Sequence, residues 1–374
     1  MMASKRRGHG EGSIYQRKDG RWVASLSLEN RQRKYFYGET RREVQEKLKV
    51  ALREQQQGTL VTASQQTVKQ FLERWVESYK PTVRLRTYVQ ARSVVYRHLI
   101  PALGHVSLQK LTPEMIRGMY RQKLDEGKKP ATVRAIHSML HRALEEAVKD
   151  GLVARNVASL VKAPRIEKGE KQVLNADQAK QLLEVVRGSS LDALLVLALA
   201  TGMRRGELLA LRWNDIDLER GTLVVRHTVS RIAGYGLVEG EPKTRAGRRR
   251  IVLPVVVVEA LRRHQAGQEQ MRVVAGDSWQ EKGIVFADKD GGFLDPDSVV
   301  RRYKRLLKRV GLPRLCFHDL RHSAATILLA ADVHPKKVQE LLGHSSISMT
   351  LDLYSHVIPS MQQDVADKMD DLLR

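Results

Sequence analysis

Residues 316–354 read CFHDLRHSAATILLAADVHPKKVQELLGHSSISMTLDLY and decide how the C-terminal part of the chain folds. Apolar residues recur at helical spacing after His318, so His318 and Arg321, three positions apart, share the opposite face of a helix. A second short helix begins at a proline and ends at the glycine before His344, which places His344 in a turn. Tyr354 falls on the apolar side of a third helix. We therefore expect two imidazoles, a guanidinium and a phenol in one compact segment.

These side chains suit attack on a phosphodiester. A guanidinium binds two phosphate oxygens and stays charged at any working pH. The phenol is the expected nucleophile. Because its reference pKa is near ~10, a histidine and an arginine are needed to take its proton and to stabilise the oxyanion.

Each residue also has a simpler interpretation. A histidine and an arginine three apart on a helix are usually a solvated pair, and Tyr354 taken alone fits a half-buried core tyrosine. His318 and His322 stand four apart, which is the spacing of a zinc-binding helix. Asp319 stands where such a helix carries a glutamate, which argues against a metal site. Only the ordered set of residues is specific.

That order resembles the C-terminal signature of the tyrosine recombinase, or phage integrase, family. Residues 318–321 read HDLR, residues 341–344 read LLGH, and Tyr354 follows ten positions later. The family also carries an arginine in a T-G-x-R segment and a lysine on a β-hairpin. Both are present in order, as Arg204 in TGMRRGE and Lys243 in EPKTRAGRRRIVLP.

The resemblance implies a site-specific DNA recombinase that integrates or excises a mobile element through a 3′-phosphotyrosine. Glu207 is interpreted as orienting Arg204, with an ordinary helix-surface glutamate as the alternative. A topoisomerase-like nicking and resealing enzyme and a non-catalytic DNA-binding regulator are the rival functions. The implied catalytic set is Tyr354 as nucleophile, Arg204 and Arg321 on the non-bridging oxygens, His318 as acceptor of the phenolic proton, His344 on the phosphoryl group and Lys243 as proton donor to the 5′ oxygen.

No metal or other cofactor is expected. The energy of the phosphodiester stays in the covalent link, so ATP is not needed. The sequence also lacks the G-x-x-x-x-G-K-S/T loop that cradles nucleotide phosphates.

The composition points to a polyanionic partner. The chain has 374 residues, with 65 Lys and Arg against 42 Asp and Glu and a formal net charge of +23. Such an excess favours double-stranded DNA. An anionic membrane is the competing polyanion, but no long basic amphipathic helix or lipidation signal supports it.

The remaining composition concerns the compartment. The basic start of the chain has no apolar signal-peptide region, and the longest apolar run is too short to span a bilayer. The single cysteine, Cys316, excludes an internal disulfide and is expected to be a small buried hydrophobe. We expect a bacterial cytoplasmic protein that associates with the nucleoid when it is on DNA.

Residues 1–62 form the first of three expected domains. SIYQRKDGRWVASLSLENRQRKYFYGET predicts three short strands, and a helix follows from Arg41 to about residue 57. The segment resembles the N-terminal arm-binding domain of integrases that contact two classes of DNA site, core and arm-type. Its strands interleave basic and aromatic residues, and its candidates for DNA contact are Arg17, Lys18, Arg21, Arg33, Lys34, Tyr35 and Tyr37.

Residues 63–165 form the second expected domain. Their apolar residues recur at helical spacing throughout, and the all-helical unit resembles the core-binding domain of the family. Its candidates for phosphate contact are basic residues, each of which is more often a plain surface charge. They are Arg84, Arg86, Lys128, Lys129, Arg134 and Arg142.

Residues 166–374 form the third expected domain, which is mainly helical with a small β-sheet. Residues 191–200 are so apolar that their helix must be buried on all sides. Strands starting at Gly221 and Arg249 are expected to flank the loop that holds Lys243, and GIVFA adds a short strand. The fold class is thus a multidomain α+β protein.

The chain closes on an amphipathic helix from Ser360, with Met369 and Leu373 on its apolar side. As in the family, this helix is expected to dock on a neighbouring subunit, and docking on its own domain is the alternative. The resemblance implies a homotetramer on DNA. An excisionase or a DNA-bending host protein would be an additional partner.

Overall fold

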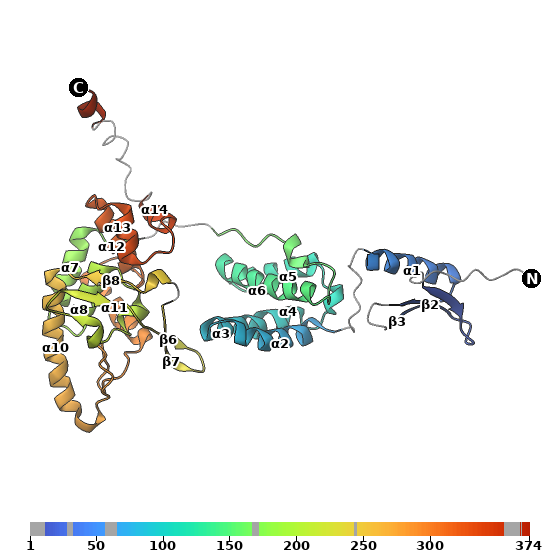
Figure 1. Ribbon diagram of the computed structural model, residues 1–374, viewed down its shortest axis with the longest axis horizontal. Helices are drawn as coiled ribbons and strands as arrows, with labels where there is room; N and C mark the ends of the chain where they lie inside the picture. The colour runs from blue at the N-terminus through green and yellow to red at the C-terminus, as the bar shows by residue number, and fades with distance from the viewer. Residues whose placement is uncertain are drawn as a thin grey trace, which may run out of the picture. The chain divides into compact units, whose positions relative to one another are not determined.

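The structure is a computed structural model that describes residues 12–27, 33–56, 66–166, 172–242, 245–354, 367 and 369–374. The chain divides into two compact units, residues 1–168 and 169–374. The predicted multidomain α+β class is confirmed: a small sheet with a helix, a helical domain, and a mainly helical domain with small sheets follow one another along the chain (Figure 1).

The N-terminal domain is a three-stranded antiparallel sheet packed on one helix (Figure 1). Its elements are β1 (Ser13–Gln16), β2 (Trp22–Ser27), β3 (Arg33–Gly38) and α1 (Arg41–Gln56), with the strands in the order β1-β2-β3. Alternate residues of the central strand, Ala24 and Leu26, pack on Val44 and Leu48 of α1. Packing of this face on the helix fixes the strand register, because a slip of one residue would turn it away from α1.

The second domain is all-helical, as predicted. Thr67 begins it with a capping box, in which its hydroxyl accepts from the amide of Gln70 and the Gln70 side chain accepts from the amide of Thr67. Its α-helices are α2 (Val68–Tyr79), α3 (Leu85–Val94), α4 (Ile100–Leu103), α5 (Pro113–Asp125) and α6 (Pro130–Lys149), and a π-helical stretch, Val95–Leu99, joins α3 to α4. One apolar core, formed by residues such as Phe71, Leu72 and Leu140, holds these helices together.

The C-terminal unit is built around α8 (Asp192–Thr201). Every residue of α8 except Ala200 is buried, which confirms the prediction of a helix enclosed on all sides. The other α-helices are α7 (Ala176–Val186), α9 (Arg205–Leu208), α10 (Val255–Ala275), α11 (Pro296–Val310), α12 (Asp319–Ala330), α13 (Pro335–Leu342) and α14 (Ser348–Tyr354).

Two small sheets complete the C-terminal unit (Figure 1). β4 (Ile216–Asp217), β5 (Thr222–Val224) and β8 (Arg250–Val252) lie in the order β4-β5-β8, and β6 (Thr228–Ile232) pairs with β7 (Gly236–Gly240). The single strand predicted from Gly221 is therefore two strands in different sheets. Glycines at 234 and 236 have positive φ and allow the tight turn between β6 and β7.

Two expectations were wrong. The GIVFA segment, residues 283–287, forms two isolated bridges, Ile284 with Arg212 and Ala287 with Phe293, instead of a strand. Cys316 is exposed, because Leu315 and Phe317 on either side of it are buried and the extended chain alternates between them.

Among the described residues, none of the helices has both the length and the apolar character needed to cross a bilayer. The predicted closing helix begins outside the described residues. At its end, Met369, Leu372 and Leu373 are exposed.

Candidate active site

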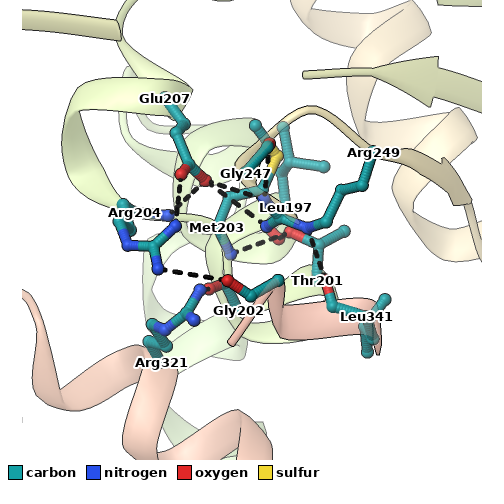
Figure 2. Close-up of polar contacts among 11 residues, drawn as sticks. Leu197, Thr201, Gly202, Met203, Arg204, Glu207, Gly247, Arg249, Arg321 and Leu341 are labelled. Atoms are coloured by element: carbon teal, nitrogen blue, oxygen red, sulfur yellow. Dashed lines mark hydrogen bonds and ion pairs between the residues drawn. The ribbon is translucent and has the colours of Figure 1, made fainter. Parts of the chain in front are cut away.

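Three segments far apart in the sequence meet at the candidate site. They are the end of α8 with the start of α9, the first turn of α12, and the turn between α13 and α14. Arg321 on α12 donates from Nη1 to the carbonyl of Gly202 at 2.8 Å, and Arg204 donates from Nη2 to the carbonyl of Gly343 at 3.3 Å. Figure 2 shows the side chains of Arg204 and Arg321 close together beside Gly202.

Gly202 makes this meeting possible. It ends α8 in the left-handed region with a φ of 60°, a conformation that favours glycine. A Cβ placed there would lie 2.2 Å from Leu342 Cδ2, so glycine is also needed for α13 to pack this closely. The predicted T-G-x-R segment thus turns the chain sharply and delivers Arg204 to the site.

Glu207 contacts Arg204 directly, in the orienting position that was one of its two interpretations. It is 3% exposed, and its Oε1 accepts from Arg204 Nη1 at 2.7 Å. Its Oε2 accepts from the backbone amide of Arg204 at 3.1 Å. A carboxylate on α9 therefore fixes both the backbone and the guanidinium of Arg204, whose side chain is 38% exposed.

Arg321 is the buried member of the predicted arginine pair. The residue is 2% exposed, and its Nη2 has no hydrogen-bond partner among the described residues. Burial, together with the charges of Arg204 and Arg249, lowers the pKa of Arg321 to about 9, so it keeps its charge at neutral pH. A buried donor without an acceptor is costly. Such a donor suits an anion that is brought by a ligand.

Arg249 is a third guanidinium, which the sequence did not single out as a site residue. Its side chain is 8% exposed, and its Nη1 and Nη2 each donate to Glu207 Oε2 at 3.3 Å. Burial is the main cause that lowers the pKa of Arg249, and the neighbouring Glu207 opposes it. Its neighbours in the run of arginines at 248–250 are exposed, so the run alone did not reveal which arginine turns inward.

The described part of this cluster is therefore positively charged. Three guanidiniums lie around one carboxylate, Glu207, and Figure 2 shows them facing a common region. Among the described residues, no other carboxylate forms an ion pair with these arginines. The arrangement leaves charge that an anion such as a phosphate can neutralise.

His344 lies in the turn after α13, as predicted. It is 8% exposed, and its Nδ1 lies 2.9 Å from Oγ1 of Thr350, which is fully buried on α14. Burial first, and then the charges of Arg321 and Arg204, lower the pKa of His344 to about 3. His344 is therefore a neutral imidazole, and Thr350, a residue not recognised from the sequence, fixes the orientation of its ring.

His318 begins α12 and is exposed. Its ring lies 5.0 Å from that of His322, edge to face. In the described ranges, groups of three or more His, Cys, Asp or Glu side chains that could hold a metal ion are absent. The structure thus places His318 three residues from Arg321 on the same helix, outside the buried cluster.

The remaining two predicted catalytic residues are only partly described. Lys243 lies outside the described residues. Tyr354 is the last residue of α14, and its side chain lies outside the described part of the structure. Four residues before it on the same helix, Thr350 holds His344.

The candidate DNA contacts of the N-terminal domain are exposed, with one exception. Tyr35 and Tyr37 alternate with the residues that face α1 and are 45% and 52% exposed. Arg17, Lys18, Arg21 and Arg33 are exposed as well. Lys34 lies on the other face of β3, with its Nζ 5.7 Å from the centre of the Phe36 ring, so the structure does not bring it together with the tyrosines.

The candidate contacts of the helical domain are all exposed. Arg84 and Lys129 stand at the N-cap positions of α3 and α6, where backbone amides are also available to an anion. Arg142 already lies over the Tyr79 ring and donates to its hydroxyl. The others, Arg86, Lys128 and Arg134, lie at or near the same two helix starts.

The arginine cluster, the neutral histidine and the helix that ends in tyrosine suit chemistry on a phosphodiester. The model of the Phage integrase family matches residues 172–361, and that of the phage integrase N-terminal SAM-like domain matches residues 67–124. An integrase of Saccharopolyspora erythraea is 30% identical, covering 96% of each chain, and one of Streptomyces ambofaciens is 31% identical, covering 99% of this chain and 98% of its own. The chain belongs to the phage integrase family. It is a site-specific tyrosine recombinase of mobile elements, as the resemblance implied.

Solved structures share the fold. The Tn1549 transposon integrase, in complex with a circular intermediate DNA, has a TM-score of 0.69 at 23% identity, covering 82% of this chain and 100% of its own. A lambda integrase dimer bound to a COC′ core site has a TM-score of 0.59 at 21% identity, covering 94% of this chain and 96% of its own. A lambda integrase tetramer bound to a Holliday junction has a TM-score of 0.57 at 21% identity, covering 89% of this chain and 95% of its own.

The buried neutral state of His344 predicts acid sensitivity. The pKa of His344 is about 3 in the folded chain against an ordinary value of 6.5. Between these two pH values the unfolded chain binds more protons, so stability falls as the pH drops below 6.5. From pH 7.5 to 5, the wild type should lose about 2 kcal/mol more than His344→Asn.

Thermal melting at both pH values measures this difference. The wild-type melting temperature should fall further than that of the variant, by roughly 4–8 °C. Burial also lowers the pKa of His264, but His264 is present in both proteins, so its contribution to the acid sensitivity cancels in the comparison. Equal drops in the two proteins would mean that His344 is not buried in its neutral form.

Proposed function

We propose that the chain cuts and rejoins DNA at a specific site through a 3′-phosphotyrosine on Tyr354, and so integrates or excises a mobile element. The observation that carries this proposal is the arginine cluster. Two guanidiniums, those of Arg204 and Arg249, pair with the single carboxylate of Glu207, and Arg321 Nη2 is buried without an acceptor among the described residues. A scissile phosphate supplies both the negative charge and the missing acceptor.

The cleavage step follows from the residues assigned. The phenolate oxygen of Tyr354 attacks the phosphorus, and the bond to the 5′ oxygen breaks. His318 takes the phenolic proton, and Lys243 gives a proton to the leaving 5′ oxygen. The number of phosphoester bonds is unchanged, so the 5′-hydroxyl of a partner strand can reverse the step and join the strands.

The cluster stabilises the transition state of this step. Arg204 and Arg321 hold the two non-bridging oxygens, where negative charge builds up as the phenolate attacks. His344 is neutral in the free protein and bonds the phosphoryl group through the ring nitrogen that does not face Thr350. Glu207 keeps Arg204 in place during the reaction.

We further propose that the two N-terminal domains bind different DNA sequences. Residues 1–62 bind arm-type sites, residues 63–165 bind the core site, and residues 166–374 carry out the chemistry. The N-terminal domain has its own core and a basic face with two exposed tyrosines. A topoisomerase-like enzyme that acts at a single site has no need of such a second module.

The proposal also covers the oligomeric state and the cellular location of the reaction. The active form is a homotetramer on two DNA duplexes, by analogy with the lambda integrase tetramer bound to a Holliday junction. The exposed Met369, Leu372 and Leu373 support docking of the closing helix on a neighbouring subunit. An excisionase or a DNA-bending host protein is an additional partner, and the reaction takes place on DNA in the bacterial cytoplasm.

Covalent trapping on nicked DNA tests the chemistry. The substrate is a DNA duplex that carries the crossover site, whose sequence is obtained by sequencing integration junctions. A nick in this duplex lets the cleaved end diffuse away, so the covalent adduct accumulates. Tyr354→Phe should bind this DNA normally and form no adduct, because only the nucleophilic oxygen is lost. Arg204→Ala and Arg321→Ala should cleave about 10²–10³-fold more slowly while binding changes little.

The control is Arg262→Ala, an exposed arginine on α10 that pairs with Glu219. It should cleave at the wild-type rate. A normal adduct yield from Tyr354→Phe would move the nucleophile elsewhere, and equal losses of binding and cleavage would make the two arginines simple phosphate anchors. No adduct from the wild type on any junction DNA would favour the non-catalytic regulator.

Footprinting of fragments tests the two-site proposal. A fragment of residues 1–62 should protect its own short repeats, with binding that weakens steeply as salt rises. The fragment from Gln65 onward should still protect the crossover site. Tethering lets two weak modules bridge distant segments, which is useful only if their sites differ. Protection of the same bases by both fragments would contradict the proposal that the two domains bind different sites.

A further inference from the structure

Arg249 is a buried arginine that the reaction steps above do not use. It lies directly before β8, in the segment that follows Lys243, and its side chain is 8% exposed. We propose that Arg249 is a positioning residue for strand cleavage, holding Glu207 and the turn before His344 so that Arg204 and His344 face one phosphate. This inference rests on the proposed function and deepens it.

Three parts of the chain meet at the Arg249 guanidinium (Figure 2). Its Nε donates to the carbonyl of Leu341, at the end of α13, at 2.6 Å. Its Nη1 and Nη2 donate to Glu207 on α9 at 3.3 Å, and Nη1 also donates to the carbonyl of Gly247 at 3.2 Å. One side chain thus ties the segment after Lys243 to the carboxylate of the site and to the turn that carries His344.

These contacts separate Arg249 from the phosphate-binding arginines. All three of its nitrogens donate to protein acceptors, whereas Arg321 Nη2 has no partner among the described residues. Arg249 therefore acts on protein groups. The planar fork of a guanidinium spans the Leu341 carbonyl and Glu207 together, which a single ammonium on a flexible stem does not do.

Sharing of Glu207 explains how Arg249 acts on Arg204. Oε2 of Glu207 is occupied by Arg249 and by the backbone amide of Arg204, so the Arg204 guanidinium reaches only Oε1, through Nη1. Its Nη2 remains directed at the carbonyl of Gly343. Without Arg249, Oε2 keeps only the backbone amide of Arg204 and can also accept from its guanidinium, and this two-point pair would draw the guanidinium away from the phosphate.

Close packing transmits the same constraint to His344. Gly343 has a φ of 66°, and a Cβ there would lie 2.6 Å from the Ala246 carbonyl and 3.1 Å from Arg249 Cδ and Nη1. The turn at Gly343 and the segment that carries Arg249 therefore pack in direct contact, with no room for a side chain between them. A shift of Arg249 therefore acts directly on Gly343, the residue before His344.

The test compares Arg249→Met with Arg250→Met in the full chain. Both variants remove one positive charge, but Arg250 is exposed and donates to Thr222 Oγ1 at 3.2 Å. On nicked crossover-site DNA at saturating protein, Arg249→Met should cleave about 100-fold more slowly than the wild type. Its Kd for this DNA should stay within about 3-fold, and Arg250→Met should cleave within about 3-fold of the wild-type rate. Arg249→Lys should lie between the two, and it carries the test if Arg249→Met fails to fold.

A double-mutant cycle tests whether Arg249 acts through Glu207. The double variant Glu207→Gln with Arg249→Met should cleave no more than about 3-fold more slowly than the slower single variant, because both changes disrupt one network. Multiplied losses would overturn the inference. A cleavage rate of Arg249→Met near that of the wild type would also overturn it, and so would equal losses of binding and cleavage in this variant. If Arg249→Met does not fold, the same two outcomes are read from Arg249→Lys. Adduct formation by the wild type in the same assay shows that the proposed function stands whichever result appears.

Discussion

One carboxylate holds the arginine cluster together. Glu207 bonds Arg204 and Arg249, and in the described part of the structure no second carboxylate pairs with these residues or with Arg321. Burying the charges of Arg249 and Arg321 beside the partly exposed Arg204, with one negative charge among them, is unfavourable in the free protein. In the proposed reaction the scissile phosphate would offset this cost, because its oxygens would meet donors that are already in place. Donors fixed before the reaction stabilise developing charge without reorganising, which is the main source of electrostatic catalysis.

Two glycines allow the segments around this cluster to pack closely. Gly202 ends α8 and lets α13 pack on it, and Gly343 lets its turn touch the segment before β8. Arg204 thereby bonds a carbonyl 139 positions later in the chain. The same turn carries His344, whose bond to Thr350 reaches α14, the helix that ends at Tyr354. The proposed phosphate site and the helix that carries the proposed nucleophile are thus linked through one imidazole.

Helices, caps and the burial of α8 followed from periodicity and composition, because those signals are local. Motifs in a fixed order singled out Arg204, Arg321 and His344, which the structure brings together, and an orienting role was one of two interpretations of Glu207, three residues after Arg204. Arg249 and Thr350 were missed, because their roles depend on partners distant in sequence or around a turn, and an inward-facing arginine in a run of three looks like its neighbours. Cys316 and Lys34 were misplaced for a related reason: alternation along an extended chain decides which face a residue takes, and its residue type does not.

The most direct measurement is the chemical location of the DNA in the covalent adduct. The wild-type chain is trapped on nicked crossover-site DNA, digested with protease, and the modified peptide is sequenced by mass spectrometry. A phosphate attached to the oxygen of Tyr354 and to the 3′ end of the cleaved strand is the predicted result, because the arginine cluster lies beside the helix that carries this residue. A link to any other residue, or to a 5′ end, would contradict the assignment of the arginine cluster as the phosphate site that serves Tyr354.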